Sequence, residues 1–190
     1  MQETNANRQS NHHNIDLLLA LIAVLMVFLA AVLRILPHPW NFTPVGAMAI
    51  FSGSLFRNRS AAFLLPLTAL FAGDLFVGFH KLMLVVYGSF ALSVVIGRWL
   101  AQSRTVAGLG GAVFLGAAQF FVLTNFAMWV FTDFYSKDAH GLAACYLAAI
   151  PLFWNTLAGD ALYAGLLFGG YALAETLLLP AAANREGAAS

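Results

Sequence analysis

Long apolar runs separated by short polar stretches fill the chain from Leu17 to Leu179. A helix that crosses a bilayer needs about 20 apolar residues, because the hydrocarbon core is about 30 Å thick and each residue adds about 1.5 Å. The pattern therefore predicts an all-α transmembrane protein, a compact bundle of six helices. The predicted spans are 17–36, 42–56, 61–79, 82–100, 107–131 and 150–178.

Two of these runs depart from the usual length. The run 42–56 is short and holds Gly46 and Gly53, so we expect a bent or tilted helix there. The apolar stretch 142–179 is far longer than a bilayer is thick. Because proline interrupts helices, Pro151 is expected to divide that stretch into a short interfacial helix and a true span.

Composition supports a membrane location. The chain of 190 residues is 61% hydrophobic and 9% charged, whereas a soluble domain carries about 25% charged residues. We expect a polar tail over 1–16, one membrane domain over 17–179, and a second tail over 180–190. The polar start lacks a basic region and a cleavage site, which favours a retained first helix. No basic run suggests a nucleic-acid partner, and the single Cys145 excludes an intrachain disulfide.

The distribution of Lys and Arg predicts the orientation. Cytoplasmic loops carry an excess of these residues. With the N-terminus inside, the inner segments hold most of the basic residues, which favours both termini in the cytoplasm. The inner set is Arg8, Arg57, Arg59, Arg98, Arg104 and Arg185, and the outer set is Arg34, Lys81 and Lys137.

One phrase occurs twice in apolar sequence. Residues 66–74 read PLTALFAGD and residues 151–160 read PLFWNTLAGD. The predicted topology places Asp74 and Asp160 in the outer half of the bundle or near its midplane. Acidic residues at that depth usually mark a substrate or ion path, although a carboxylate can also lock the packing of neighbouring helices. The phrase is either an inverted repeat of the kind found in transporters or a coincidence.

Each predicted outer loop carries one histidine, namely His38, His80 and His140. Neutral imidazole is a common metal ligand, and with an aspartate it can hold a divalent ion. No two of these histidines are four residues apart, so the spacing is not that of a metal motif. Ordinary interfacial polar residues remain the alternative.

Aromatic and amide side chains also collect near the outer face. Trp40 and Asn41 follow the first span, Tyr87 lies in the first turns of the fourth, and Asn125 and Trp129 share a face of the fifth. An aromatic belt at the membrane interface explains the tryptophans. A belt does not explain the amide of Asn125 or the acid of Asp160. Such polar groups suit a pocket with aromatic walls that binds a small ligand.

Several segments carry a family resemblance: RILPHPWNFTPVGAMAIFSG, GDLFVGFH, LTNFAMW and GLAACYLAAIPLFWNTLAGD. In this order they resemble a family of small six-span bacterial membrane proteins described only as transport proteins. That family resembles the S-components of energy-coupling-factor (ECF) vitamin transporters, including the solitary cobalamin-uptake S-components. The resemblance implies a multi-pass protein of the bacterial inner (cytoplasmic) membrane that binds a vitamin-like molecule in an outward-facing pocket.

The resemblance also nominates site residues and partners. Cobalamin is the leading substrate, with His80 or His38 as the cobalt ligand, and no separate cofactor is expected. Many S-components dock an energising ECF module through an Ala-x-x-x-Ala pair on the first span, which this chain lacks, so that partner is in doubt. The ligand-binding set comprises His38, Trp40, Asn41, Asp74, His80, Tyr87, Asn125, Trp129 and Asp160.

Other function classes fit less well. Intramembrane aspartyl proteases carry a Gly-x-Gly-Asp motif, but Phe71 stands two residues before Gly73, and the chain has no Tyr-Asp pair. No serine or cysteine nucleophile stands in a motif with histidine, so we expect no enzyme. A divalent-metal or ion permease that uses the intramembrane aspartates and outer histidines is the main alternative. A structural or assembly protein of the membrane is the other.

Overall fold

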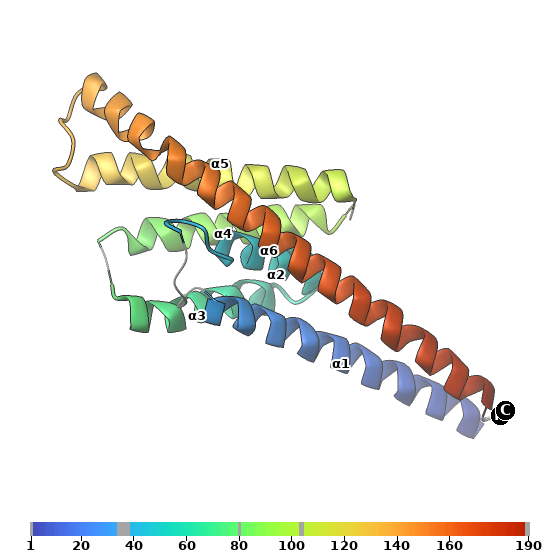
Figure 1. Ribbon diagram of the computed structural model, residues 1–190. Helices are drawn as coiled ribbons and strands as arrows, with labels where there is room; N and C mark the ends of the chain where they lie inside the picture. Colours follow the sequence, from blue (N-terminus) through green and yellow to red (C-terminus); the bar gives the residue numbers. More distant parts are fainter. Residues whose placement is uncertain (1, 34–38, 80, 103–104, 189–190) are drawn as a thin grey trace.

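The computed structural model describes residues 2–33, 39–79, 81–102 and 105–188, and within them all regular structure is α-helical (Figure 1). The all-α prediction is therefore confirmed. Five helices in this part of the chain are long and apolar enough to cross a membrane, and α2 is shorter. The helices are α1 (Gln2–Leu33), α2 (Val45–Leu55), α3 (Arg59–Val77), α4 (Met83–Leu100), α5 (Val106–Phe131) and α6 (Ala139–Ala188).

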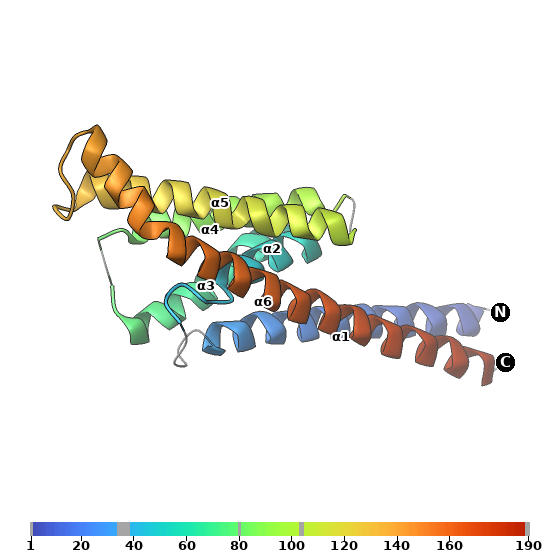
Figure 2. The ribbon, with the colours of Figure 1, turned by 45° about the horizontal axis from the view of Figure 1, so that its top comes forward.

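The helices run back and forth along one axis. The end of α3, the start of α4 and the α5–α6 connection lie at one end of the molecule. The α2–α3 turn, the end of α4 and the start of α5 lie at the other (Figure 1). The start of α1 and the end of α6 lie near each other beyond that second end in every view (Figure 2). Both helices extend into the predicted tails, and the division into tails and one membrane domain stays a prediction.

Helix α2 corrects the prediction of a second span over 42–56. It has 11 residues, and at about 1.5 Å each it covers about half of a bilayer. Residues 39–44, which precede it, are not helical. Ten of its 11 residues are buried, so α2 has no lipid-facing side. A helix that is apolar all round belongs in the interior of a bundle.

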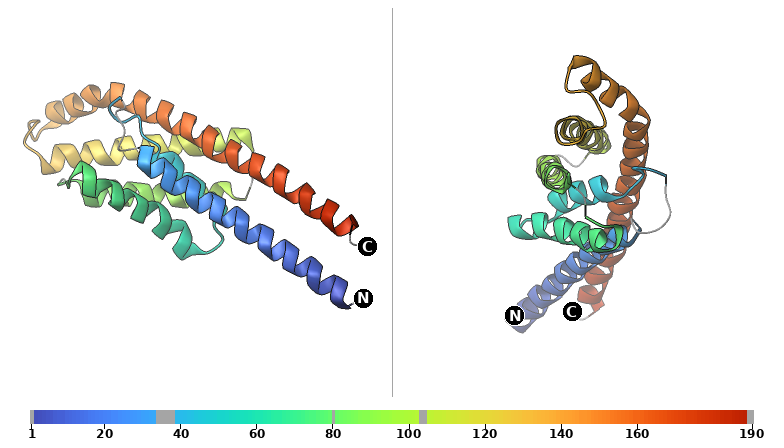
Figure 3. Two further views of the ribbon diagram at one scale, coloured as in Figure 1. Left: turned by 60° about the horizontal axis from the view of Figure 1, so that its bottom comes forward. Right: turned by 90° about the vertical axis from the view of Figure 1, so that its left-hand side faces the viewer.

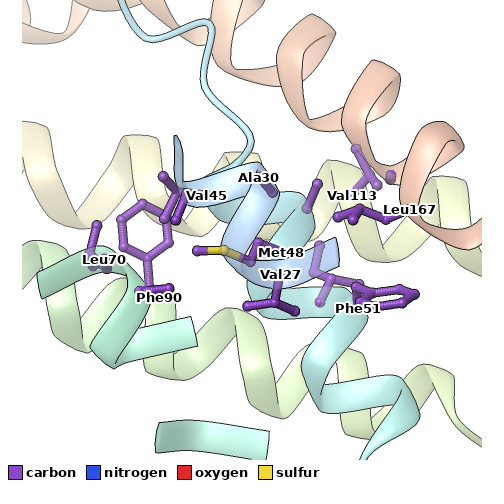
Figure 4. Packing of buried hydrophobic residues seen from close by; sticks show 14 of the residues in the cluster. Val27, Ala30, Val45, Met48, Phe51, Leu70, Phe90, Val113 and Leu167 are labelled. Carbon is purple, nitrogen blue, oxygen red and sulfur yellow. The ribbon is translucent and has the colours of Figure 1, made fainter. Parts of the chain in front are cut away.

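The core is built around α2. Met48 and Phe51 of α2 are fully buried and belong to a cluster that includes side chains from all five other helices (Figure 4). The surrounding side chains labelled in Figure 4 are Val27 and Ala30 of α1, Leu70 of α3, Phe90 of α4, Val113 of α5 and Leu167 of α6. Many large apolar side chains elsewhere are exposed, among them Leu166, as expected where lipid replaces water as the solvent.

Two glycines hold α2 against α4. A Cβ added to Gly53 would lie 2.1 Å from the carbonyl oxygen of Val94, and one added to Gly97 would lie 2.1 Å from that of Ile50. Only glycine permits this approach of the two backbones, as at other close helix contacts in membranes. The contact fixes α2 along its length, and both ends of α2 border cavities.

Helix α6 also differs from the prediction. It is continuous over 50 residues, so the expectation that Pro151 ends a separate interfacial helix is wrong. The helix is instead curved (Figure 3), and a proline in the interior is a usual cause of bending because it removes one backbone hydrogen bond. One long curved helix therefore passes beside the start of α2.

Candidate binding site

The carboxylate of Asp160 on α6 caps the buried start of α2. Its Oδ1 accepts a hydrogen bond from the amide of Ala47 at 2.9 Å, and the carboxylate also accepts from the amide of Gly46. The first amides of a helix lack partners within it and carry partial positive charge. The N-cap residue Pro44 provides no side-chain hydrogen bond. Asp160 is 3% exposed and, although it belongs to α6, it caps the start of α2.

Glycines make this contact possible. A Cβ on Gly46 would lie 2.3 Å from Oδ2 of Asp160, and a Cβ on Gly159 would lie 3.1 Å from the amide nitrogen of Thr43. Any larger side chain at Gly46 would displace the carboxylate. The Gly-Asp pair of α6 thus meets the backbone of segment 41–47 without a side chain between them.

The same face of α6 holds residues 39–44, which we call the lid segment. Asn155 donates from Nδ2 to the backbone oxygen of Trp40 at 3.0 Å, and the rings of Tyr163 and Phe42 meet edge to face at 6.0 Å. Asn41 has a φ of 62°, a left-handed conformation that asparagine tolerates better than most residues. The lid segment is therefore fixed to α6 at Trp40 and at Phe42.

A small cavity lies beneath the lid segment. Its volume is about 40 Å³, enough for a few water molecules, since one water needs about 10–15 Å³ by the same measure. Oxygen-bearing side chains share its wall with two phenyl rings and two glycines. The lining residues are Asn41, Thr43, Gly46, Phe90, Ser93, Gly116, Phe120, Thr156 and Asp160.

Polar contacts continue behind the cavity into α5. Nε2 of Gln119 donates to Oγ of Ser93 at 3.0 Å and to the backbone oxygen of Ser89 at 2.9 Å. Among the described residues, Oε1 of Gln119 and Oγ of Ser89 are buried without a partner. Because buried polar atoms are nearly always hydrogen-bonded, these two atoms mark places where water or a ligand can bind.

The second aspartate lies in a separate contact. Oδ2 of Asp74 on α3 accepts a hydrogen bond from the hydroxyl of Tyr87 on α4 at 2.7 Å. Asp74 is 1% exposed, and neither residue lines the cavity beneath the lid segment. The structure therefore brings Asp74 and Tyr87 together, as a pair that joins α3 to α4.

Other predicted site residues lie away from the cavity. Asn125 donates to the backbone oxygen of Phe121 in its own helix. Trp129 donates from Nε1 to the backbone oxygen of Ser136 at 2.8 Å, which orders the α5–α6 connection. The side chain of Trp40 is 82% exposed. Of the predicted residues that the structure describes, Asn41 and Asp160 border the cavity.

The described residues form no cluster of metal-ligating side chains. His140 is exposed, and His38 and His80 lie outside the described residues. Within those residues, no three His, Cys, Asp or Glu side chains gather where a metal ion could bind. A cobalt or metal ligand at His38 or His80 stays a prediction.

Sequence reasoning missed the cavity residues Thr43 and Ser93 and the neighbouring Gln119. Serine and threonine are common in membrane proteins and give no signal individually. Gln119 gave a usable signal, since it is a lone amide in a long apolar helix and such residues usually face the bundle interior. The packing of α4 against α5 brings Gln119 to Ser93, and that packing cannot be read from the local sequence.

No curated protein and no solved structure matches the chain. A family model matches residues 15–182, which include the lid segment and Asp160. That match extends over most of the chain and over the whole of the site described above. The chain belongs to DUF6580, a family of unknown function.

Proposed function

We propose that the protein is a multi-pass membrane transport protein that binds a small molecule in the cavity beneath the lid segment. The observation that carries the proposal is the placement of Asp160. It lies near the middle of the apolar stretch Ala139–Leu179, caps the start of α2, and borders a polar cavity.

An interrupted membrane segment at this depth supports transport. Non-helical backbone within a bilayer is tolerated only where protein or a water-filled cavity surrounds it. In many transporters the substrate site is built from short helices that begin near the midplane. The lid segment and α2 form such an interrupted unit, because a turn closed by the bond from the amide of Phe42 to the backbone oxygen of Pro39 precedes the short helix.

The lid segment also supports the resemblance to S-components, in which the loop after the first span often covers the vitamin. Here that loop supplies Asn41 and Thr43 to the cavity wall. We accordingly propose an outward-facing site in a bacterial inner-membrane protein with cytoplasmic termini. Opening requires the lid segment to separate from Asn155 and Tyr163 of α6.

Cobalamin remains the leading substrate within this proposal. The closed cavity of about 40 Å³ is much smaller than the 300–1,000 Å³ of typical ligand pockets. A vitamin can bind only after the lid segment has moved, which exposes the polar wall of α4 and α5. The uptake experiment described next also tests whether the protein works with an energising ECF module.

The first experiment measures cobalamin binding and uptake. We expect the purified protein to bind cobalamin on titration and to rescue uptake in a vitamin auxotroph, tested with and without an energising module. Thr156→Phe fills the cavity and should abolish both. Thr68→Phe is the matched control, because Thr68 also bonds a carbonyl of its own helix but lies outside the cavity. Absence of binding in the unmodified protein would refute the cobalamin assignment.

A small-cation permease is the second candidate. The specific observation in its favour is the size of the closed cavity, which suits a monatomic ion or ammonium and has a carboxylate in its wall. The two amides at Asp160 already offset much of that charge, so we rank this candidate second. It predicts cation flux into proteoliposomes, or bound Ni, Co or Zn by elemental analysis, which Asp160→Asn reduces while Asp74→Asn does not.

A further inference from the structure

A second polar cavity lies at the opposite end of α2. It has a volume of about 330 Å³ and is lined by the end of α2, the turn that follows and the last turn of α4. Two of its lining residues are arginines, and none is acidic. The lining residues are Gly53, Ser54, Leu55, Phe56, Arg57, Arg98 and Ala101.

The arginine on α4 is held in place. Nη1 of Arg98 donates to the backbone oxygen of Phe56, the residue after α2, at 3.3 Å. A guanidinium has five N–H donors, so this contact leaves the others for a ligand. The close α2–α4 contact at Gly53 and Gly97 fixes the backbone beside it. Arg57 borders the same cavity from an exposed position.

The depth of this cavity fits a lipid headgroup. Arg98 lies in the last turn of α4, an apolar helix of 18 residues that spans about 27 Å, and Arg57 lies between two helices. Both arginines therefore stand at the level where a bilayer passes from hydrocarbon to headgroups. Basic pockets between membrane helices at that level bind anionic phosphate groups.

An apolar cavity adjoins the arginine cavity and shares Leu55 with it. Its volume is about 350 Å³, and Leu100, Phe168 and Tyr171 contribute to its wall. Glu175 is the one acidic residue in its lining. A basic pocket beside an apolar cavity suits a molecule that carries both a phosphate group and a hydrocarbon chain. Free phosphate has no hydrocarbon chain and would leave the apolar cavity unused.

We propose that Arg57 and Arg98 bind the phosphate of an anionic phospholipid whose acyl chain lies along the adjoining apolar cavity. The guanidinium of Arg98 supplies a planar set of donors suited to phosphate oxygens. Arg57 adds a second positive charge. The bound lipid bridges α2, α4 and α6 at the end of the bundle remote from the lid segment.

The test compares lipids on the intact purified protein. In native mass spectrometry from detergent, phosphatidylglycerol should bind more tightly than phosphatidylcholine, and inorganic phosphate should compete weakly. Arg57→Gln and Arg98→Gln should each weaken phosphatidylglycerol binding about fivefold. Arg98→Lys keeps the charge without the planar donors and should fall between.

Arg59→Gln is the matched control, since Arg59 is exposed nearby at the start of α3 and lines neither cavity. Arg57 is exposed and has no hydrogen bond or ion pair with the other residues that the structure describes, so its variant separates lipid binding from folding. Equal binding of the two lipids, or equal losses in Arg57→Gln and Arg59→Gln, would overturn the proposal. Full competition by inorganic phosphate would identify a free-anion site instead.

Discussion

The two Ala-Gly-Asp phrases, alike in sequence, meet different partners. In the second phrase, Asp160 accepts from backbone amides at the start of α2 and borders a cavity. In the first phrase, Asp74 accepts from the side-chain hydroxyl of Tyr87. One aspartate positions a backbone segment, and the other joins two helices through side chains.

The positions of the phrases differ as well. Asp74 lies three residues before the end of α3, whereas Asp160 lies far from both ends of α6. The helices α3 and α6 run in opposite directions (Figure 1), as an inverted repeat requires. Their partners and depths do not correspond, which favours coincidence over internal symmetry. A shared phrase therefore does not establish a shared role.

The largest expected effect comes from Gly46→Ala. The new Cβ would overlap the carboxylate of Asp160, so we expect a loss of about 3–5 kcal/mol in the free energy of unfolding from overpacking together with the two lost hydrogen bonds. Gly165→Ala is the control, because its Cβ would meet nothing within 4 Å. Denaturant titration in detergent measures both. Equal stability of the two variants would contradict the contact.

Next in size is the contrast between asparagine variants. Asn offers one acceptor oxygen, so Asp160→Asn leaves one amide of Gly46 or Ala47 without a partner and should cost about 1–3 kcal/mol. Asp74→Asn can still accept from the hydroxyl of Tyr87 and should cost less than 1 kcal/mol. The same denaturant titration tests the difference. A larger cost for Asp74→Asn would reverse the comparison of the two phrases.

A double-mutant cycle tests the partner of the first phrase. Asp74→Ala and Tyr87→Phe should show a coupling free energy of about 1–2 kcal/mol, as expected for a buried hydrogen bond between two side chains. Asp160→Ala with Tyr87→Phe should be additive within about 0.5 kcal/mol. Coupling of similar size in both cycles would show that the two aspartates act together.

A smaller effect is expected at the lid segment. Asn155→Ala removes the bond to the backbone of Trp40 and should cost about 0.5–1 kcal/mol. In a Cys145→Ala background that also carries Thr43→Cys, this change should speed labelling by a thiol reagent a few-fold. Thr68→Ala is the control and should leave labelling unchanged. Slower labelling after Asn155→Ala would contradict a lid held by α6.

The smallest effect concerns Asp138, an exposed aspartate at the start of α6. The amide of Gly141 and the hydroxyl of Ser136 donate to its carboxylate and lower its pKa below the usual 3.8. Because the pKa is lower in the folded than in the unfolded chain, ionised Asp138 stabilises the folded state at pH values above the unfolded pKa. That stabilisation is lost as the pH falls through the folded pKa. The protection of the Gly141 amide from exchange, relative to its intrinsic rate at each pH, should therefore fall below about pH 3.8, and Asp138→Asn should remove this dependence.

Several helices could be predicted closely from sequence. The expected spans 61–79, 82–100 and 107–131 differ by one or two residues from α3, α4 and α5. Asn58 and Thr105 cap two of these helices through local side-chain bonds, which is chemistry that the sequence displays directly. Hydrophobic length and capping are properties of neighbouring residues, so they require no knowledge of the fold.

The site could be predicted only in part. Asp160 was selected because an acid in an apolar stretch is costly, and that reasoning applies equally to Asp74. That reasoning could not assign different roles to the two aspartates, because each role depends on which segment of the folded chain lies opposite the carboxylate. Trp129 was selected for its place on a helix face, but the fold of the α5–α6 connection gave it a partner there.

The sequence by itself determined the class of the protein and most of its helices, because hydrophobicity and length decide what a bilayer accepts. The tertiary structure decided that α2 is short, that α6 is continuous, and that Asp160 caps α2. Asp160 and Ala47 are 113 positions apart in the chain. A buried amide binds the acceptor that packing brings within reach, and no local pattern encodes that distance.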